Sequence, residues 1–589
     1  MSTIDRLLSA MPPQPEEVAD KADEPGHTVG PVYNAGHGRG GTPANGEGSM
    51  TSQSEAKRFA HAWIDDNRER LSAFDLEIWR YAEPAWREYR SARAYVELLR
   101  AEGFEVEEGS GGMPTAFAAT WVSGNGDGPV IGSYAEYDAT PASSQEPVPY
   151  QQPRAGLHPY AAGHTDPHSM LGVGALAGVL GAKAAMERHG LAGTLRFFGE
   201  PAEKVCGSKP VHAAKGYYDG ADAFLSYHPM NANTTLWETH CGSYWSAVFT
   251  FECAEPEKWA ELGQSPSAMT DSAASSHITA RCPGAIDALC LMYTTTKYTK
   301  EAMFPHTGTW TLNEFVLAAG DATADNLPPR IAQIQYSWRS PQLDIQERIW
   351  RVLENNAKAA AAATGCQAWV QWVTKTRVGL ANNALADLTY RNMELVGAPT
   401  FSAEAKQFGR DLQQTLGLEP MEEPFSPTYE KLTPPQEYEA ATRTLLPEWQ
   451  KNFTSDDYVD YTWHAPTVRI YTGRPTLRPP SPGYQYPAWS YNAMGGRAEI
   501  VDPGLFLAAK TIAGTALDLI EQPAELARAK AEFVERTGGG IGGNKWVAPL
   551  LPVDFFPPID LRWPEYVTTE RGEEWWLPTP NPEARERLT

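Results

Sequence analysis

Apolar and polar positions follow two different periods over residues 55–240. Apolar residues recur at helical spacing over residues 55–100 and Met170–Arg188, and a glycine, Gly103 or Gly190, follows each stretch and favours a helix end. Three short apolar runs, within PVIGSYAEYD, GTLRFFGEPAEK and DAFLSYHP, are typical of buried strands. Because these strands alternate with helices, the pattern predicts a parallel α/β sheet.

Residues 241–378 show a different pattern. Alternating segments such as SYWSAVFTFE and RIAQIQYSWRSP are interspersed with helical ones such as QERIWRVLENNAKAAAAATG, which predicts a smaller α+β unit of the ferredoxin-like kind. Patterns like those of the first part resume over residues 379–536. The expected fold class is therefore α/β, with a mostly parallel sheet formed by residues 51–240 and 379–536 and interrupted by the α+β unit.

The two ends of the chain differ from this core in composition. Residues 1–50 are rich in proline, glycine and charge and poor in aliphatic side chains, so a disordered or extended arm is expected. Residues 537–589 form a C-terminal extension that is glycine-rich and then rich in proline and tryptophan. Exposed tryptophan is unfavourable, and we expect this extension to pack on the body or on another subunit.

Net charge and the positions of the cysteines make several classes of function and site unfavourable. The formal net charge of −24 disfavours binding to nucleic acid or to an anionic membrane. The six cysteines are dispersed and indicate neither a zinc knuckle nor a disulfide framework, which favours a reducing cytoplasm. The sequence has no apolar leader and no run of about 18 apolar residues, so no membrane segment is expected.

Residues that could bind a metal or take part in catalysis follow the predicted strands directly. Residues just past the carboxyl ends of parallel strands converge on one crevice. The loop GHTDPHS enters the following helix from the same side. Imidazoles and carboxylates gathered in this way suit a divalent ion of the zinc or manganese type, although any single histidine is more often a loop or capping residue. The residues expected in the crevice are Glu136, Asp138, Asp166, His168, Glu200, Glu203, Lys204 and His228.

Several motifs occur in order along residues 55–530. GSYAEYDATP, GHTDPHSMLGVGAL, GTLRFFGEPAEK, LSYHP, SSHITA, DNLPPRIAQIQYSWRSP and TSDDYVDYTWHAPT each resemble a motif of one known family. This family is the metal-dependent aminoacylase and carboxypeptidase G type of peptidases and amidohydrolases, and the resemblance is strongest to its aminobenzoyl-glutamate hydrolase branch. It implies an α/β catalytic domain with a lid domain that commonly mediates dimerisation.

The resemblance also implies roles for individual residues. The family hydrolyses an amide with a water held between two metal ions and a glutamate as general base. Glu203 matches the base, His168 and His228 match metal ligands, and Asp166 stands where this branch has a bridging cysteine. His277 matches the lid histidine that helps to stabilise the oxyanion, often across a dimer. Further residues expected to support a ligand or to contact substrate are Glu136, Asp138, His164, Glu200, Asn326 and His464.

Two positions depart from the family pattern. The second glutamate of its E-E pair, a ligand to one metal, is Lys204 here, and the late ligand histidine of the other metal aligns with Pro487. Each of the two metal sites therefore loses one ligand. A conventional two-metal centre is not expected.

Three arrangements can accommodate this loss. A single ion can be held by Asp166, His168 and His228, helped by His464 or Glu200. Alternatively, the Lys204 ammonium replaces one cation as a fixed positive charge near Glu203. The third arrangement retains the scaffold for binding without catalysis, and so the expected cofactor is a divalent metal, zinc or manganese, as one ion rather than two, or none.

The function expected from the resemblance is hydrolysis of a small amide-type C–N bond, in an N-acyl amino acid, a dipeptide or an aminobenzoyl-amino acid conjugate. Glu203, Lys204 and His277 are the candidate catalytic residues. The alternatives are a metal-independent or single-metal enzyme that uses Glu203 and Lys204 on an unusual C–N bond, and a non-catalytic binding subunit. The expected partners are a small-molecule amide substrate and further copies of the chain in a homodimer or higher homo-oligomer, without nucleic acid or membrane.

Overall fold

A computed structural model describes most of the chain. The described residues are 53–155, 161–256, 281–307, 309–320, 327–453, 455–561 and 563, together with the backbone of 565–569, 572–576 and 586–587. The arm predicted for residues 1–50 lies outside them.

The larger of two main sheets has seven strands in the order β1-β2-β4-β3-β5-β11-β6. Its four central strands, β4, β3, β5 and β11, run parallel, and the outer strands pair antiparallel. The bounds are β1 Glu105–Glu108, β2 Phe117–Ser123, β3 Val130–Ala135, β4 Gly193–Gly199, β5 Ala223–Met230, β6 Thr234–Thr235 and β11 Thr467–Gly473. The predicted α/β class is confirmed, because β3, β4 and β5 are the three strands expected from the apolar runs.

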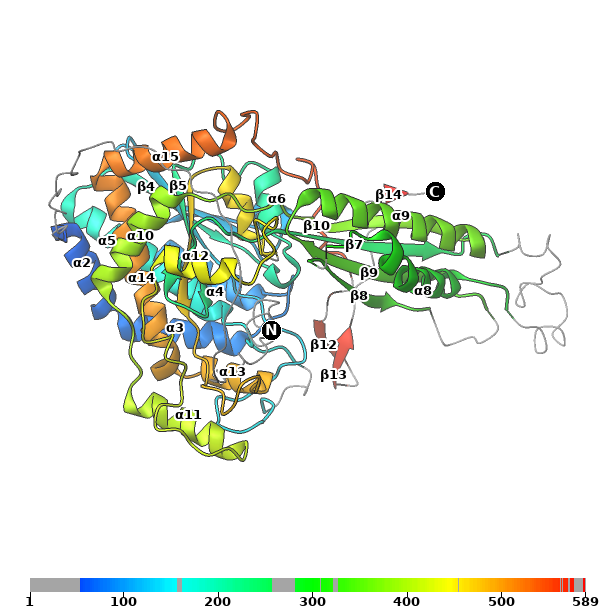
Figure 1. The fold of residues 1–589 in the computed structure, drawn as a ribbon, viewed down its shortest axis with the longest axis horizontal. Coiled ribbons are helices and arrows are strands. Elements are labelled where there is room, and N and C mark those ends of the chain that lie inside the picture. Colours follow the sequence, from blue (N-terminus) through cyan, green and yellow to red (C-terminus); the bar gives the residue numbers. More distant parts are fainter. Residues whose placement is uncertain are drawn as a thin grey trace, which may run out of the picture.

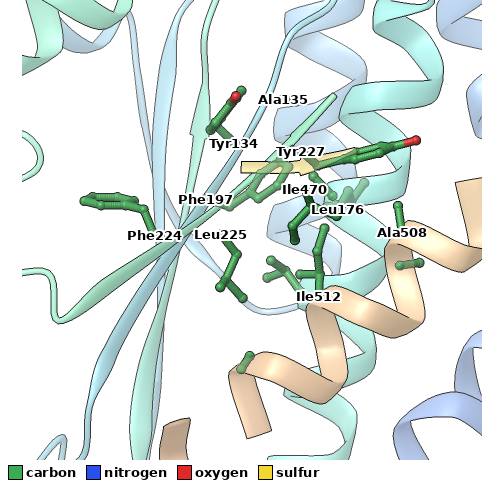
Figure 2. Packing of buried hydrophobic residues seen from close by; sticks show 14 of the residues in the cluster. Tyr134, Ala135, Leu176, Phe197, Phe224, Leu225, Tyr227, Ile470, Ala508 and Ile512 are labelled. Carbon is green, nitrogen blue, oxygen red and sulfur yellow. The ribbon is translucent and has the colours of Figure 1, made fainter. Parts of the chain in front are cut away.

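Helices cover this sheet, and two of them, α5 and α14, are buried along most of their length. Figure 2 shows Leu176 of α5 and Ile512 of α14 packed beside strand residues such as Phe197. A Cβ on Gly178 would lie 2.7 Å from the Cβ of Ile512, so glycine permits α5 and α14 to pack this closely. The helices around the sheet are α2 Glu55–Asp66, α3 Arg68–Tyr81, α4 Tyr89–Ala101, α5 His168–His189, α6 Lys209–Ala214, α10 Asn383–Val396, α11 Ala403–Thr415, α12 Pro435–Arg443, α13 Ala488–Gly495, α14 Ala498–Glu521 and α15 Pro523–Thr537, with short 3-10 turns η1 Ser110–Gly112, η2 Glu203–Val205 and η5 Tyr458–Trp463.

Helices α5 and α14 are long and apolar enough to cross a membrane by length and composition alone. However, 94% and 83% of their apolar windows are buried inside the protein. Such burial is typical of central helices that pack on a sheet, where both sides of the helix meet apolar neighbours.

The second sheet is antiparallel and has the strand order β14-β10-β7-β9-β8. Its main strands and two helices follow the chain order β7, α8, β8, β9, α9, β10, which is the βαββαβ arrangement of the predicted ferredoxin-like unit. The bounds are β7 Ser243–Glu252, α8 Ala285–Met303, β8 Thr311–Ala318, β9 Ile331–Ser340, α9 Leu343–Thr364, β10 Gln367–Lys375 and β14 Glu586–Arg587. Figure 1 shows this unit projecting from the body that contains the parallel strands, and we refer to it as the lid.

The C-terminal extension crosses from the body to the lid. Arg377 donates a hydrogen bond of 3.0 Å to the carbonyl of Val547, and Gln371 of β10 donates one of 3.1 Å to Asp560. Trp563 is 6% exposed and its ring lies 6.4 Å from that of Trp86. The expected packing of the extension is therefore confirmed for this stretch. Strands β12 Glu565–Thr569 and β13 Gly572–Trp576 follow as a hairpin.

A buried carboxyl group on α3 makes the stability of this fold depend on pH. Asp75 is fully buried, and burial raises its pKa from 3.8 to about 8. Between these two values the folded protein binds a proton that the unfolded chain has lost, so the free energy of unfolding falls as the pH rises, by up to about 1.4 kcal/mol per pH unit. Asp75→Asn should remove this dependence, so that the variant gains stability relative to wild type from pH 5 to pH 8 in urea unfolding. A difference between the two proteins that stays constant with pH would contradict the prediction.

Candidate active site

The carboxyl ends of three neighbouring parallel strands bring the predicted residues together. Glu136 and Asp138 follow β3, Glu203 and Lys204 lie in η2 after β4, and His228 lies near the end of β5. Asp166 and His168 come from the loop that begins α5, with His168 as the first residue of that helix. The convergence of side chains expected from the strand pattern is therefore present.

His168 is held in one orientation by Asp138. Its Nδ1 lies 2.8 Å from Asp138 Oδ1, and both side chains are fully buried. The other oxygen of Asp138 accepts a hydrogen bond of 2.8 Å from the backbone N–H of Lys204, which fixes η2 against the same carboxylate. With Nδ1 engaged, Nε2 faces the crevice and lies 3.3 Å from both Glu136 Oε2 and Glu203 Oε2. A carboxylate behind a histidine in this way is typical of metal ligands.

The Lys204 ammonium group lies in the middle of this cluster rather than in solvent. Its Nζ is 2.8 Å from His168 Nε2, 3.1 Å from Asp166 Oδ2 and 3.5 Å from Glu203 Oε2. Burial opposes the charge, but Asp166 and Glu203 outweigh it and raise the pKa of Lys204 above its usual value. The ammonium therefore stays charged and occupies the position that a cation ligated by these three side chains would take.

A second cation position faces His228. Its Nδ1 donates a hydrogen bond of 2.7 Å to the carbonyl of Pro229, which leaves the lone pair of Nε2 directed at Asp166 Oδ1, 3.9 Å away. Burial lowers the pKa of His228 to about 4, so the imidazole is neutral at neutral pH. The two oxygens of Asp166 thus face two cation positions, with Lys204 at one and His228 at the other.

The side chains around His228 fit one divalent ion. Glu136 Oε2 and Asp166 Oδ1 are buried and have no hydrogen-bond donor within the described ranges. Ligand atoms of Glu136, His168 and His228 lie within 4.8 Å of one another. Imidazole nitrogen and carboxylate oxygen are the donors that zinc and manganese accept, and tetrahedral zinc places its ligand atoms about 3.4 Å apart. The residues present therefore fit an ion at the His228 position, whereas Lys204 fills the other.

Glu203 is presented by a strained turn. The residues on either side of η2, Ala202 and Cys206, have φ angles of 57° and 50°, which is unusual for side chains with a Cβ. The buried carboxylate of Glu88 supports this conformation by accepting a hydrogen bond of 2.7 Å from the backbone N–H of Ala202. Burial acts to raise the pKa of Glu203, but the charge of Lys204 and the hydrogen bond from His168 lower it well below its usual range. Glu203 is therefore ionised, and its side chain is 14% exposed.

Two residues expected to help hold the metal are engaged elsewhere. Glu200 accepts hydrogen bonds of 2.7 Å from the hydroxyls of both Tyr218 and Tyr461, and its carboxylate lies 3.0 Å from His212 Nδ1. His464 lies 3.0 Å from Asp219. Among the described contacts none joins Glu200 or His464 to Asp166, His168 or His228, so these two do not form part of the cluster.

The remaining predicted residues have other locations. His164 is 1% exposed in the loop before α5, where burial lowers its pKa well below the usual value, and this fits a structural role in the loop. His277 and Asn326 lie outside the described residues. Their expected roles at the lid remain predictions.

A buried lysine beneath the cluster was missed by the sequence reasoning. Lys209 at the start of α6 is fully buried, and its Nζ lies 2.7 Å from both Glu136 Oε1 and Asp457 Oδ1. The residue before Asp457, Asp456, pairs with the buried Arg469. Asp456 and Asp457 fall within the TSDDYVDYTWHAPT motif, which was a signal for the acidic partners. Nothing in the local pattern distinguishes Lys209 from an exposed lysine.

Comparison with known proteins supports the family resemblance. The chain is 25% identical over 483 residues to one subunit of the p-aminobenzoyl-glutamate hydrolase of Escherichia coli, covering 79% of this chain and 92% of that one. It is 27% identical over 328 residues to the Xaa-Arg dipeptidase of Mus musculus, covering 53% and 64%. No family model matches the chain. The resemblance inferred from the motifs is thus confirmed over most of the sequence.

Two solved structures are similar over most of the chain. One is an aminobenzoyl-glutamate utilization protein from Klebsiella pneumoniae, with 14% identity, a TM-score of 0.48, and coverage of 79% of this chain and 99% of that one. The other is a Bacillus subtilis protein described as a dinuclear metal binding peptidase from the M20 family, with 15% identity, a TM-score of 0.40, and coverage of 78% of this chain and 99% of that one.

The geometry predicts the metal content of the protein. The purified chain should contain one divalent ion, and His228→Ala should lose it because the ion loses its imidazole ligand. Lys204→Glu should raise the content to two ions, since it replaces the ammonium with a carboxylate between Asp166, His168 and Glu203. Inductively coupled plasma mass spectrometry measures the metal content of all three proteins, with Lys451→Glu at an exposed position as the control. Two ions in wild type, or no gain in Lys204→Glu, would contradict the assignment.

Proposed function

We propose that this chain, a relative of metal-dependent peptidases and amidohydrolases, hydrolyses a small amide-type C–N bond at the cluster around Glu203 and Lys204. One observation carries the proposal: an ionised carboxylate, 14% exposed, lies 3.5 Å from an ammonium group whose side chain is 20% exposed, beside a set of candidate metal ligands. This arrangement combines a proton acceptor with positive charge, which are the two requirements of amide hydrolysis by water.

The side chains have distinct parts in the reaction. Glu203 accepts a proton from the attacking water as the new C–O bond forms, and returns it to the leaving nitrogen as the C–N bond breaks. The Lys204 ammonium provides a fixed positive charge next to the negative charge that develops on the carbonyl oxygen. Asp138 keeps His168 and the backbone of Lys204 in place, so that both charges are set before substrate binds.

A divalent ion fits beside this pair. His228, Asp166 and Glu136 would hold it, with His168 at the boundary between the ion and Lys204. When bound, the ion would polarise the scissile carbonyl and lower the pKa of water. Zinc and manganese both match the donor atoms.

The substrate class follows from the relatives. One of them belongs to a p-aminobenzoyl-glutamate hydrolase and the other is a Xaa-Arg dipeptidase, and both names describe an amide that joins an amino acid to a second group. We therefore propose an N-acyl amino acid, a dipeptide or an aminobenzoyl-amino acid conjugate as substrate. The dispersed positions of the six cysteines fit a reducing compartment, and we propose a cytoplasmic location.

Conservative substitution of the proposed base tests this function. Glu203→Gln keeps the shape of the side chain and removes the proton acceptor, so turnover of aminobenzoyl-glutamate, N-acetyl amino acids and dipeptides should fall by about 10²–10⁴-fold. Lys204→Met should lower turnover by about 10²–10³-fold, the loss typical of one oxyanion-stabilising group. Glu97→Gln on the exposed face of α4 is the matched control and should retain full activity. The readout is release of the free amine.

Two other results would favour the alternatives. If wild type binds these amides in calorimetry without turnover, and Glu203→Gln binds them equally well, the chain is a non-catalytic binding protein. If turnover persists after complete removal of metal but is lost in Lys204→Met, the chemistry is metal-independent and rests on Glu203 and Lys204.

We also propose that two copies of the chain associate through the lid. Strand β8 is the edge of the second sheet, and its residues Phe315 and Val316 are 53% and 51% exposed. The neighbouring helix α8 exposes Tyr298 and Met303 at 75% and 55%. An open strand edge next to exposed apolar side chains favours association with a matching edge.

A charge on this edge tests the association. Phe315→Glu should convert a dimer into a monomer in sedimentation velocity, because burying a carboxylate in an apolar interface is unfavourable. Val122→Glu, at a 50% exposed position on β2, is the matched control and should leave the dimer intact. A wild-type protein that sediments as a monomer, or an equal effect of both variants, would refute the proposal.

A further inference from the structure

Two cysteines face each other at the outer end of the lid. The antiparallel register of β7 and β10 pairs Glu252 with Gln367, and one step further along the ladder it sets Cys253 opposite Cys366. Directly opposed residues of antiparallel strands have Cα atoms about 4.5–5.5 Å apart. Disulfides join Cα atoms about 4.4–6.8 Å apart, so the spacing that this register implies for the two cysteines matches the spacing that a bond requires.

The two thiols differ in exposure. Cys253 is 1% exposed, whereas Cys366 is half-buried. A hydrogen bond from the Cys253 side chain lowers the pKa of the Cys366 thiol, which increases its thiolate fraction. Cys366 is thus the accessible and more reactive member, and Cys253 is the protected one directly beside it.

We propose that Cys253 and Cys366 form a reversible disulfide that links the end of β7 to the start of β10. A hydroperoxide is the oxidant. The Cys366 thiolate attacks its terminal oxygen, the O–O bond breaks, and a sulfenic acid forms with release of water or an alcohol. The Cys253 sulfur then attacks the Cys366 sulfur and displaces the hydroxyl group as water, so two thiols are oxidised by two electrons while one peroxide is reduced.

The bond would close a large loop. Residues 253–366 include α8, β8, β9 and α9, so that only strands β7 and β10 lie outside the cross-linked segment of the βαββαβ unit. A cross-link between distant residues restricts the unfolded chain and raises stability without changing the folded contacts. The oxidised lid should therefore unfold at a higher temperature than the reduced lid.

Peptide mapping tests the assignment. The purified full-length protein is treated with hydrogen peroxide, alkylated and digested without reductant, and then analysed by mass spectrometry. The expected product is a peptide pair joined through Cys253 and Cys366, lighter by two hydrogen atoms than the separate thiol peptides and released by dithiothreitol. Cys366→Ser should abolish the pair. Cys290→Ser, at an exposed position on α8, is the control and should form it normally.

Two outcomes would overturn the proposal. One is oxidation of Cys366 to sulfinic acid with Cys253 still alkylated, which shows that the two sulfurs do not react. The other is a pair between Cys253 and Cys282, the third cysteine near this end of the lid. A thermal midpoint measured on the same samples provides a second readout, because peroxide should raise it in wild type and Cys290→Ser but not in Cys366→Ser.

Discussion

The position of the Lys204 ammonium group is the constraint on which the rest of the site depends. It lies among Asp166 and His168, which come from the loop that begins α5, and Glu203, its neighbour in η2. Buried carboxylates this close together would repel one another without a cation between them. The ammonium removes that repulsion permanently, whereas a dissociable metal ion would remove it only when bound.

The balance of buried charge extends beyond Lys204. Lys209 Nζ lies 2.7 Å from both Glu136 and Asp457, and Arg469 pairs with Asp456. Among the described residues of the cluster, buried oxygens without a donor lie on Glu136 and Asp166, at the His228 side, and on Asp457. The first two lie where a divalent ion fits. One ion and one lysine therefore give a consistent description of the site.

The lid and the body are joined by more than the two chain crossings. Arg377, where β10 returns to the body, is fully buried and pairs with Asp460 of η5 at 2.7 Å. The same guanidinium also contacts the C-terminal extension through Val547. Removing one partner of a buried ion pair strongly destabilises a protein. The pair between Arg377 and Asp460 therefore holds η5, which follows Asp457, against the base of the lid.

The sequence by itself determined which strands form the parallel sheet, and hence which residues meet at its carboxyl edge. Glu136, Asp138, Glu203, Lys204 and His228 follow from this rule, because a strand end is a local feature that periodicity reveals. The rule specifies a position along the strand but not the direction of the side chain. Glu200 illustrates the difference, since it follows β4 as expected but points to Tyr218 and Tyr461.

Only the tertiary structure decided how the charges pair. Lys209 and Asp457 are 248 positions apart and have no local pattern in common, yet they lie 2.7 Å from each other. The sequence left the replacement of a cation by Lys204 as one of three arrangements, and only the fold placed its ammonium group 3.1 Å from Asp166 and 2.8 Å from His168. The physical reason is that hydrophobic periodicity encodes which face of an element is buried, whereas electrostatic pairing depends on distances between elements that no single segment contains.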